Sequence, residues 1–297
     1  MSYYDLPCDQ CGHPNDINWD ICHNKDCAET ITAPFIIRLA SIAAEQTALN
    51  DNYRLAKTQL GSKGKGNALM IFEDMIDRQA SVTMTAPVDF VFDWFLRKKD
   101  AFLPYRKQVE LKIREHATYV NAKKRSYVDS AIFADREMIF GAMTLDETGL
   151  TSYGPVIMIL NTKFVRRNTG LLIENSFNFH DRIVEEHKWT VNDPLPAGNL
   201  CVWNERQKLA VIKCKEQIVS NDDSSRFSEY ILKSTGDRKT DEFMEAYIDA
   251  EFYPAMVEKL KFPADLITDF ETNPDLLEYK LQFEELGRKV IVESYAK

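Results

Sequence analysis

Four cysteines near the N-terminus have the type and spacing that suit the binding of a metal ion. They are arranged as Cys8-x2-Cys11-x10-Cys22-x4-Cys27 and are four of the six cysteines in a chain of 297 residues. Two cysteines separated by two residues can point both thiolates at one ion, and four thiolates complete the tetrahedral shell of structural zinc. We therefore predict a zinc site with no open position, whose role is structural.

The spacing leaves two histidines as alternative ligands, since His13 or His23 could replace one of the cysteines. The segment resembles short zinc ribbons in its CxxCG opening and in Trp19, which precedes the second cysteine pair. This resemblance implies that residues 1–30 form a small module with a structural metal. Such modules commonly dock on a protein partner or read nucleic acid.

A second set of polar residues lies in the stretch from Phe140 to His180. Three apolar runs there are predicted to be strands, at residues 139–145, 156–160 and 171–173. Tyr153 stands beside a glycine at the start of the second run, and Ser176 follows the third. Polar and glycine residues that end apolar strands are typical of a binding cleft, and this pattern predicts one.

From here the chain resembles bacterial ADP-ribosyltransferase toxins, over residues 130–255. In that fold a basic residue on one strand holds NAD, a Ser- or Tyr-bearing strand lines the nicotinamide pocket, and a later Glu completes catalysis. The resemblance implies that Arg136, Tyr153 and Ser176 bind NAD, and that Glu245 and Tyr153 are catalytic. It further implies transfer of ADP-ribose to a protein or nucleic acid, by a toxin or a defence effector.

The chemistry explains why such an enzyme needs a carboxylate. Cleavage of the glycosidic bond of NAD builds positive charge on the ribose, and a nearby carboxylate stabilises that charge. Glu242 and Glu251 are rivals to Glu245, because all three lie in one acidic segment that we expect to be an amphipathic helix.

Two other functions are open. In a metal-dependent nuclease, carboxylates and a lysine would converge on Mg²⁺ and a phosphate. The available set is Glu174 and Glu205 with Lys208 or Lys213. The other function is non-enzymatic: the zinc ribbon and the helix expected at 33–60 would bind a protein partner, or the chain would bind nucleic acid.

The elements that would position these residues suggest an α+β protein. We expect a zinc ribbon at 1–30, a linking helix with a Gly/Lys linker at 31–67, and an α+β main domain with a split mixed sheet at 68–297. The linker is the GSKGKGN run, whose glycines disfavour a helix. Residues 180–196 are expected to be irregular, and the chain from residue 262 onward to be helical.

Composition sets limits on the partners. The hydrophobic content of 44% supports a sizeable core, and the net charge of −9 disfavours nucleic-acid binding over the whole surface. Residues 97–125 are the exception, with ten bases against three acids. We expect this basic segment to contact a nucleic acid or a protein substrate. The sequence contains no apolar run of 18 residues and no signal-peptide pattern, so we expect a cytoplasmic protein without a membrane span.

Overall fold

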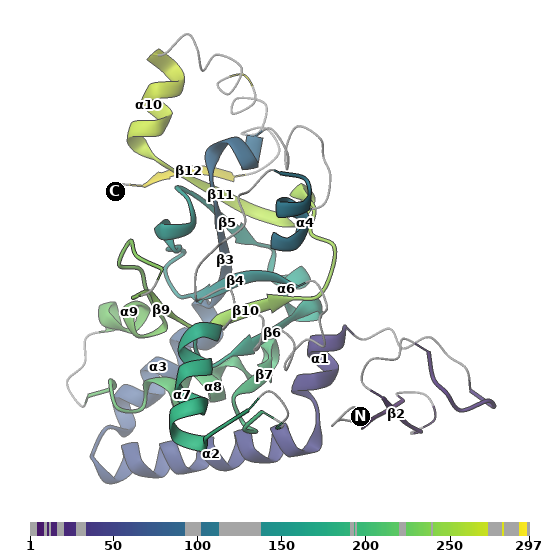
Figure 1. The fold of residues 1–297 in the computed structure, drawn as a ribbon. Helices are drawn as coiled ribbons and strands as arrows, with labels where there is room; N and C mark the ends of the chain where they lie inside the picture. The colour runs from purple at the N-terminus through teal and green to yellow at the C-terminus, as the bar shows by residue number, and fades with distance from the viewer. Residues whose placement is uncertain are drawn as a thin grey trace.

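The computed structural model describes most of the chain, namely residues 5–8, 11, 13–16, 21–27, 34–92, 102–112, 138–190, 193, 195–219, 224–238, 240–272, 281 and 291–295. In them, helices surround one large sheet (Figure 1). The helices are α1 (Phe35–Ala40), α2 (Ala43–Ser62), α3 (Gly66–Gln79), α4 (Tyr105–Glu110), α6 (Thr162–Asn168), α7 (Ser176–His187), α8 (Arg206–Cys214), α9 (Phe227–Ile231) and α10 (Ala264–Thr272).

The large sheet has eight strands in the order β12-β11-β5-β3-β4-β10-β6-β7. The pair β11–β12 is parallel and the other neighbouring strands are antiparallel, so the sheet is mixed, as the sequence predicts. Two smaller sheets pair β1 with β2 and β8 with β9. The strands are β1 (Asp5–Pro7), β2 (Pro14–Asp16), β3 (Ser81–Ala86), β4 (Ile139–Thr144), β5 (Val156–Leu160), β6 (Thr169–Leu172), β7 (Leu200–Val202), β8 (Leu232–Lys233), β9 (Glu242–Phe243), β10 (Glu245–Ile248), β11 (Val257–Pro263) and β12 (Ile291–Tyr295).

The three strands predicted from apolar runs are confirmed as β4, β5 and β6. All five residues of β5 are buried, and so are all four of β6. A strand that is buried on both faces has a continuous apolar run instead of an alternating pattern. These runs were therefore the clearest strand signals in the sequence.

The acidic helix predicted over residues 242–251 is wrong, because Glu245 lies on strand β10. This strand pairs with β4 on one side and with β6 on the other. Its side chains alternate between two cores, as the two-residue period of a strand requires. Ala246 and Ile248 pack with α2, α3 and α8, whereas Tyr247 packs with α1 and α7.

Two other expectations also need correction. The segment from residue 180, expected to be irregular, begins inside α7, which extends to His187 and is capped at its start by Asn175. The chain after residue 262 contains helix α10 but also the strand β12, which pairs with β11. That pairing partner lies some thirty residues earlier, so the local pattern could not indicate it.

The helical region before the main sheet divides into α1 and α2, with a break at Ser41 and Ile42. The glycine-rich run was expected to break the helical pattern over residues 61–67, but α2 extends to Ser62 and α3 begins at Gly66, so only residues 63–65 form the turn between them. Leu49 of α2 and Phe72 of α3 are fully buried in the same core as strand residues of the large sheet. Helix α2 lies at the β7 end of that sheet, and α10 lies at the β12 end (Figure 1). The three-part division of the chain stays a prediction.

Candidate active site and metal centre

The four N-terminal cysteines lie together in the structure. The sulfur atoms are 3.9 Å apart between Cys8 and Cys27 and 3.6 Å apart between Cys11 and Cys22, and all four lie within 4.8 Å of one another. Zinc–sulfur bonds of about 2.3 Å in a tetrahedron place the sulfurs about 3.8 Å apart. The four thiols are unbridged and fit this geometry, so they can bind a metal ion.

A small hairpin brings the first two cysteines together. Strands β1 and β2 pair antiparallel, and the Cys8 backbone N–H donates to the His13 carbonyl oxygen (2.8 Å). A hydrogen bond with the backbone of His13 is the main cause that lowers the pKa of the Cys11 thiol to about 7. In the described part of the chain, the metal-binding group consists of cysteines, and neither His13 nor His23 belongs to it.

The other two cysteines belong to the core. Cys201 and Cys214 are fully buried. Burial raises the pKa of Cys201 well above its usual range and that of Cys214 to about 12. A thiol that stays protonated is a poor nucleophile, so neither side chain is suited to nucleophilic catalysis.

A cleft lies against the large sheet, where residues of the strands β3, β4 and β10 line it. Its volume is about 110 Å³, and its lining is mostly apolar, with several aromatic side chains. Three residues selected from the sequence line it together: Tyr153, Ser176 and Glu245. Pockets for whole drug-sized ligands have volumes of roughly 300–1,000 Å³, so this cleft suits one ring of a larger ligand. The site assignments themselves stay predictions.

Glu245 has a fixed position in this cleft. Its side chain is 8% exposed, and its Oε2 atom accepts hydrogen bonds from the Ser176 backbone N–H (2.7 Å) and the Tyr247 hydroxyl (3.0 Å). The first donor belongs to the first turn of α7, where backbone N–H groups have no partner within the helix. Donors of this kind stabilise a carboxylate and hold it in one orientation.

Tyr153 lies across the cleft in a short 3₁₀ turn, Thr151–Tyr153, that leads into β5. Gly154 follows it with a φ of +151°, and a Cβ atom there would lie 2.1 Å from the backbone of Ala86. Only glycine allows this close approach of the turn to β3. The Thr85 hydroxyl holds the same turn by donating to the Leu150 carbonyl oxygen (2.8 Å).

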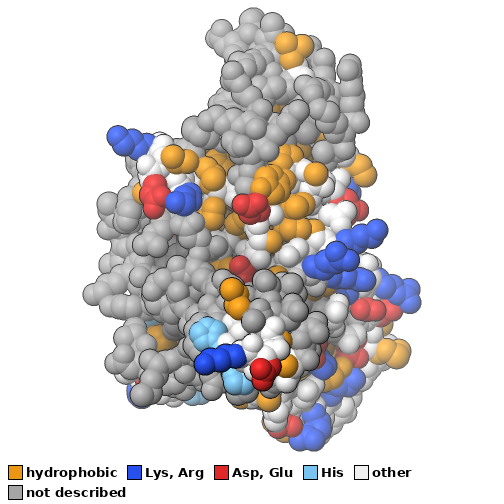
Figure 2. Space-filling view, turned by 90° about the vertical axis from the view of Figure 1, so that its right-hand side faces the viewer, with side chains coloured by type: hydrophobic (Ala, Val, Ile, Leu, Met, Phe, Trp, Pro, Cys, Tyr) orange, Lys and Arg blue, Asp and Glu red, His pale blue; other side chains and the backbone are white. Residues whose placement is uncertain are grey.

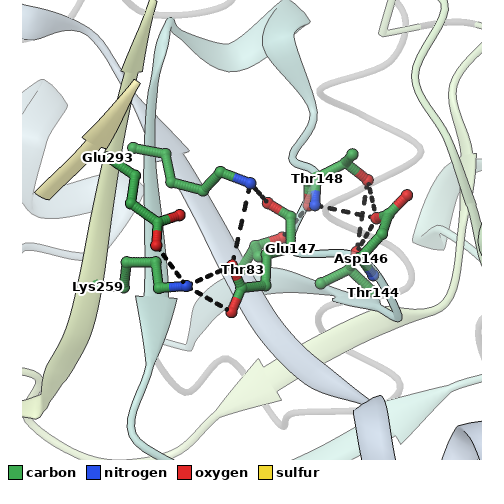
Figure 3. Close-up of polar contacts among 8 residues, drawn as sticks. Thr83, Thr144, Asp146, Glu147, Thr148, Lys259 and Glu293 are labelled. Carbon is green, nitrogen blue, oxygen red and sulfur yellow. Dashed lines mark hydrogen bonds and ion pairs between the residues drawn. The ribbon is translucent and has the colours of Figure 1, made fainter. Parts of the chain in front are cut away.

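A polar network anchors the start of this turn (Figure 3). Asp146 accepts hydrogen bonds from the hydroxyl groups of Thr144 (2.9 Å) and Thr148 (2.7 Å). Beside it, Lys259 of β11 bridges Glu147 (2.8 Å) and Glu293 of β12 (3.0 Å). The segment that leads to Tyr153 is thus joined to β3, through the Thr83 hydroxyl that donates to the Thr148 carbonyl oxygen (3.0 Å), and to β11 through Lys259.

Several predicted positions lie outside the described residues. Arg136 is one of them, and so are most of the bases of the segment 97–125, including Lys123, Lys124 and Arg125. Figure 2 shows one face of the molecule on which hydrophobic side chains gather in the upper half and Lys and Arg side chains gather toward one edge. Because most bases of the segment 97–125 lie outside the described residues, its contact with a nucleic acid or a protein stays a prediction.

The structure separates Glu245 from its two rivals. Glu242 and Glu251 are exposed, and neither lines the cleft. The acidic residues considered for a nuclease are also apart from any metal-binding group in the described chain. Glu174 pairs with Arg182, and Glu205 pairs with Lys208 at 2.7 Å.

Sequence reasoning missed the residues that support the predicted ones. Tyr247 donates to Glu245 from two positions further along the same strand. A strand assignment for 245–248 would have placed both side chains on one face. The aromatic lining residues Phe140 and Phe177 also went unassigned, although Phe177 directly follows Ser176 in the sequence.

Comparisons with protein-family models and with curated proteins each found no match to this chain. Among the described residues, none of the helices has both the length and the apolar composition that crossing a bilayer requires.

Proposed function

We propose that this chain transfers ADP-ribose from NAD to a macromolecule, with Glu245 as the catalytic carboxylate, and that its four N-terminal cysteines bind a structural zinc ion. One observation carries the enzymatic proposal. A buried glutamate with two hydrogen-bond donors lies in a mostly apolar cleft that Tyr153 and Ser176 also line. The resemblance described above selected these three residues from separate parts of the sequence.

The proposed reaction replaces one bond at the ribose. The bond between C1′ of the ribose and the nicotinamide nitrogen breaks, and nicotinamide leaves with the electron pair of that bond. A nucleophile of the acceptor then donates its own electron pair to C1′ and loses its proton to the solvent. Glu245 stabilises the positive charge that builds up on the ribose between these two events.

The cleft suits the nicotinamide end of the dinucleotide. A flat ring can stack against Tyr153, Phe140 or Phe177. The remainder of the dinucleotide would lie outside the cleft. Because the donors to Glu245 come from the backbone of α7 and from β10, the carboxylate needs no rearrangement when charge develops.

The acceptor is proposed to bind the basic segment 97–125, whose charge suits a nucleic acid or an acidic protein. In the zinc module, the sulfur distances support a structural zinc ion, which would hold the short hairpin of β1 and β2 in place. This module and helix α2 would then be available to bind a partner.

The test is incubation of the full chain with labelled NAD and a cell lysate, followed by separation of protein, RNA and DNA. Label on one of these fractions that depends on Glu245 supports the proposal. An unlabelled lysate, together with no binding of NAD or nicotinamide to the purified chain, would leave the non-enzymatic zinc-ribbon interaction protein as the better proposal.

A further inference from the structure

Arg238 lies against the cleft tyrosine, and it has no acidic partner among the residues that the structure describes. It belongs to the loop between β8 and β9, and its guanidinium group lies 4.5 Å from the centroid of the Tyr153 ring. Its Nε atom donates to the Ser152 carbonyl oxygen (3.0 Å). Among the residues that the structure describes, Arg238 forms no ion pair, and its two terminal nitrogens have no hydrogen-bond partner.

Asp241, three residues further along the chain, hydrogen-bonds with neutral groups of the described residues and forms no ion pair with Arg238 there. Asp241 is completely buried, and neutral donors occupy both of its carboxylate oxygens. The Ser152 hydroxyl donates to one oxygen (2.5 Å), and the Thr235 backbone N–H donates to the other (2.6 Å). These bonds join the loop of Arg238 to the turn of Tyr153, so the arginine is held beside Tyr153 before any ligand arrives.

We propose that Arg238 binds a phosphate group of the nucleotide whose ring enters the cleft. This inference rests on the proposed function. A guanidinium group offers two parallel N–H donors that match the oxygens of a phosphate, and its flat face stacks on an aromatic ring. Here the face lies on Tyr153 while the terminal nitrogens keep their hydrogen-bonding capacity. The arrangement lets the side chain stack on the cleft tyrosine and still bind an anion through its terminal nitrogens.

The ligand class follows from this geometry. A group bound through Arg238 must be linked to a ring in the cleft by only a short spacer, such as a ribose, because the arginine contacts the cleft tyrosine directly. The diphosphate of a dinucleotide meets this requirement. Nicotinamide alone contains a ring but no phosphate, and ADP-ribose contains the diphosphate but no nicotinamide, so the two halves can be tested separately.

The experiment measures binding of ADP-ribose, inorganic pyrophosphate and nicotinamide by calorimetry, using the full metal-loaded chain and the variants Arg238→Gln, Arg238→Lys and Tyr153→Ala. We expect Arg238→Gln to weaken ADP-ribose binding by about ten- to a hundredfold, as for loss of one charge-assisted contact. Nicotinamide binding should stay unchanged in this variant and weaken in Tyr153→Ala. Arg238→Lys should restore part of the affinity for ADP-ribose.

The matched control is Arg226→Gln, because Arg226 also stacks on a tyrosine, Tyr230, which does not line the cleft. It should leave binding of all three ligands unchanged. Equal ADP-ribose binding by wild type and Arg238→Gln would overturn the inference. So would an equal loss of nicotinamide binding in Arg238→Gln, since the arginine would then act only by positioning Tyr153.

Failure of the proposed function has a different signature. If pyrophosphate and ADP-ribose bind through Arg238 but no label passes from NAD to any fraction, the phosphate site stands and the transferase proposal falls. If label is transferred while Arg238→Gln binds ADP-ribose like the wild type, the transferase proposal stands and the phosphate site falls. A wild-type chain that binds neither phosphate ligand overturns the inference directly.

Discussion

The backbone N–H of Ser176 donates a 2.7 Å hydrogen bond to the carboxylate of Glu245, across 69 positions of sequence. This bond joins the start of helix α7 to the central strand β10. The positive end of a helix favours a nearby carboxylate, so α7 supports the charge of Glu245 as well as its orientation.

Replacing Glu245 by Gln should reduce turnover by about a hundredfold or more, because the carboxylate charge opposite the developing cation is lost. NAD binding should persist, since the amide oxygen can still accept the bonds from Ser176 and Tyr247. Label transfer and calorimetry measure the two quantities. Glu242→Gln is the matched control: it removes the same charge from an exposed position three residues away and should leave turnover unchanged. Full activity of Glu245→Gln would contradict the proposed role.

Metal analysis of the purified chain should find about one zinc ion. Replacing Cys8 by Ser removes one thiolate ligand, so the ion should be released and residues 1–30 should loosen while the main domain still unfolds cooperatively. Cys214→Ala serves as the control because this buried cysteine lies outside the cluster. The metal content of this variant should equal that of the wild type. A metal-free wild type with four reactive thiols would refute the zinc assignment.

Stability should depend on pH through Glu45 of α2, which is 3% exposed and accepts a hydrogen bond from the Gly198 backbone N–H (2.7 Å). Burial is the main cause that raises the pKa of Glu45 to about 7. Because the folded state holds this proton more tightly, the contribution is fully present below the unfolded pKa of 4.5 and is lost as pH rises through 7.

Urea unfolding at pH 5 and pH 8 measures this effect. The wild type should lose up to about 3 kcal/mol over this interval relative to Glu45→Gln, which cannot titrate. The difference between the two proteins is the relevant quantity, because other groups titrate equally in both. Parallel pH profiles for the wild type and Glu45→Gln would show that burial of this carboxyl group has no such cost.

Removing the charges of Lys123, Lys124 and Arg125 should weaken binding to RNA or DNA and flatten its dependence on salt. Each phosphate contact that is lost reduces the slope of log affinity against log salt by about one. The control replaces three exposed bases of α6, Lys163, Arg166 and Arg167, which changes the net charge equally. An equal effect of both triple variants would indicate general charge attraction, and salt-independent binding would argue against a polyanion contact.

The sequence by itself determined the features that depend on residues close in the chain. The four cysteines lie within twenty positions, so their spacing alone indicated a shared ion. The buried runs of β4, β5 and β6 were also evident, because a continuous apolar run is what a doubly covered strand requires.

Only the tertiary structure decided where Glu245 lies and what it contacts. The acidic segment around it has a helical pattern, but pairing with β4 and β6 on both sides makes residues 245–248 a strand. That strand turns Glu245 and Tyr247 toward α7 and brings the carboxylate to Ser176. Arg238 likewise reaches Tyr153 from a distant loop. Such contacts depend on strand pairing and packing between remote segments, and no local pattern of residue types specifies them.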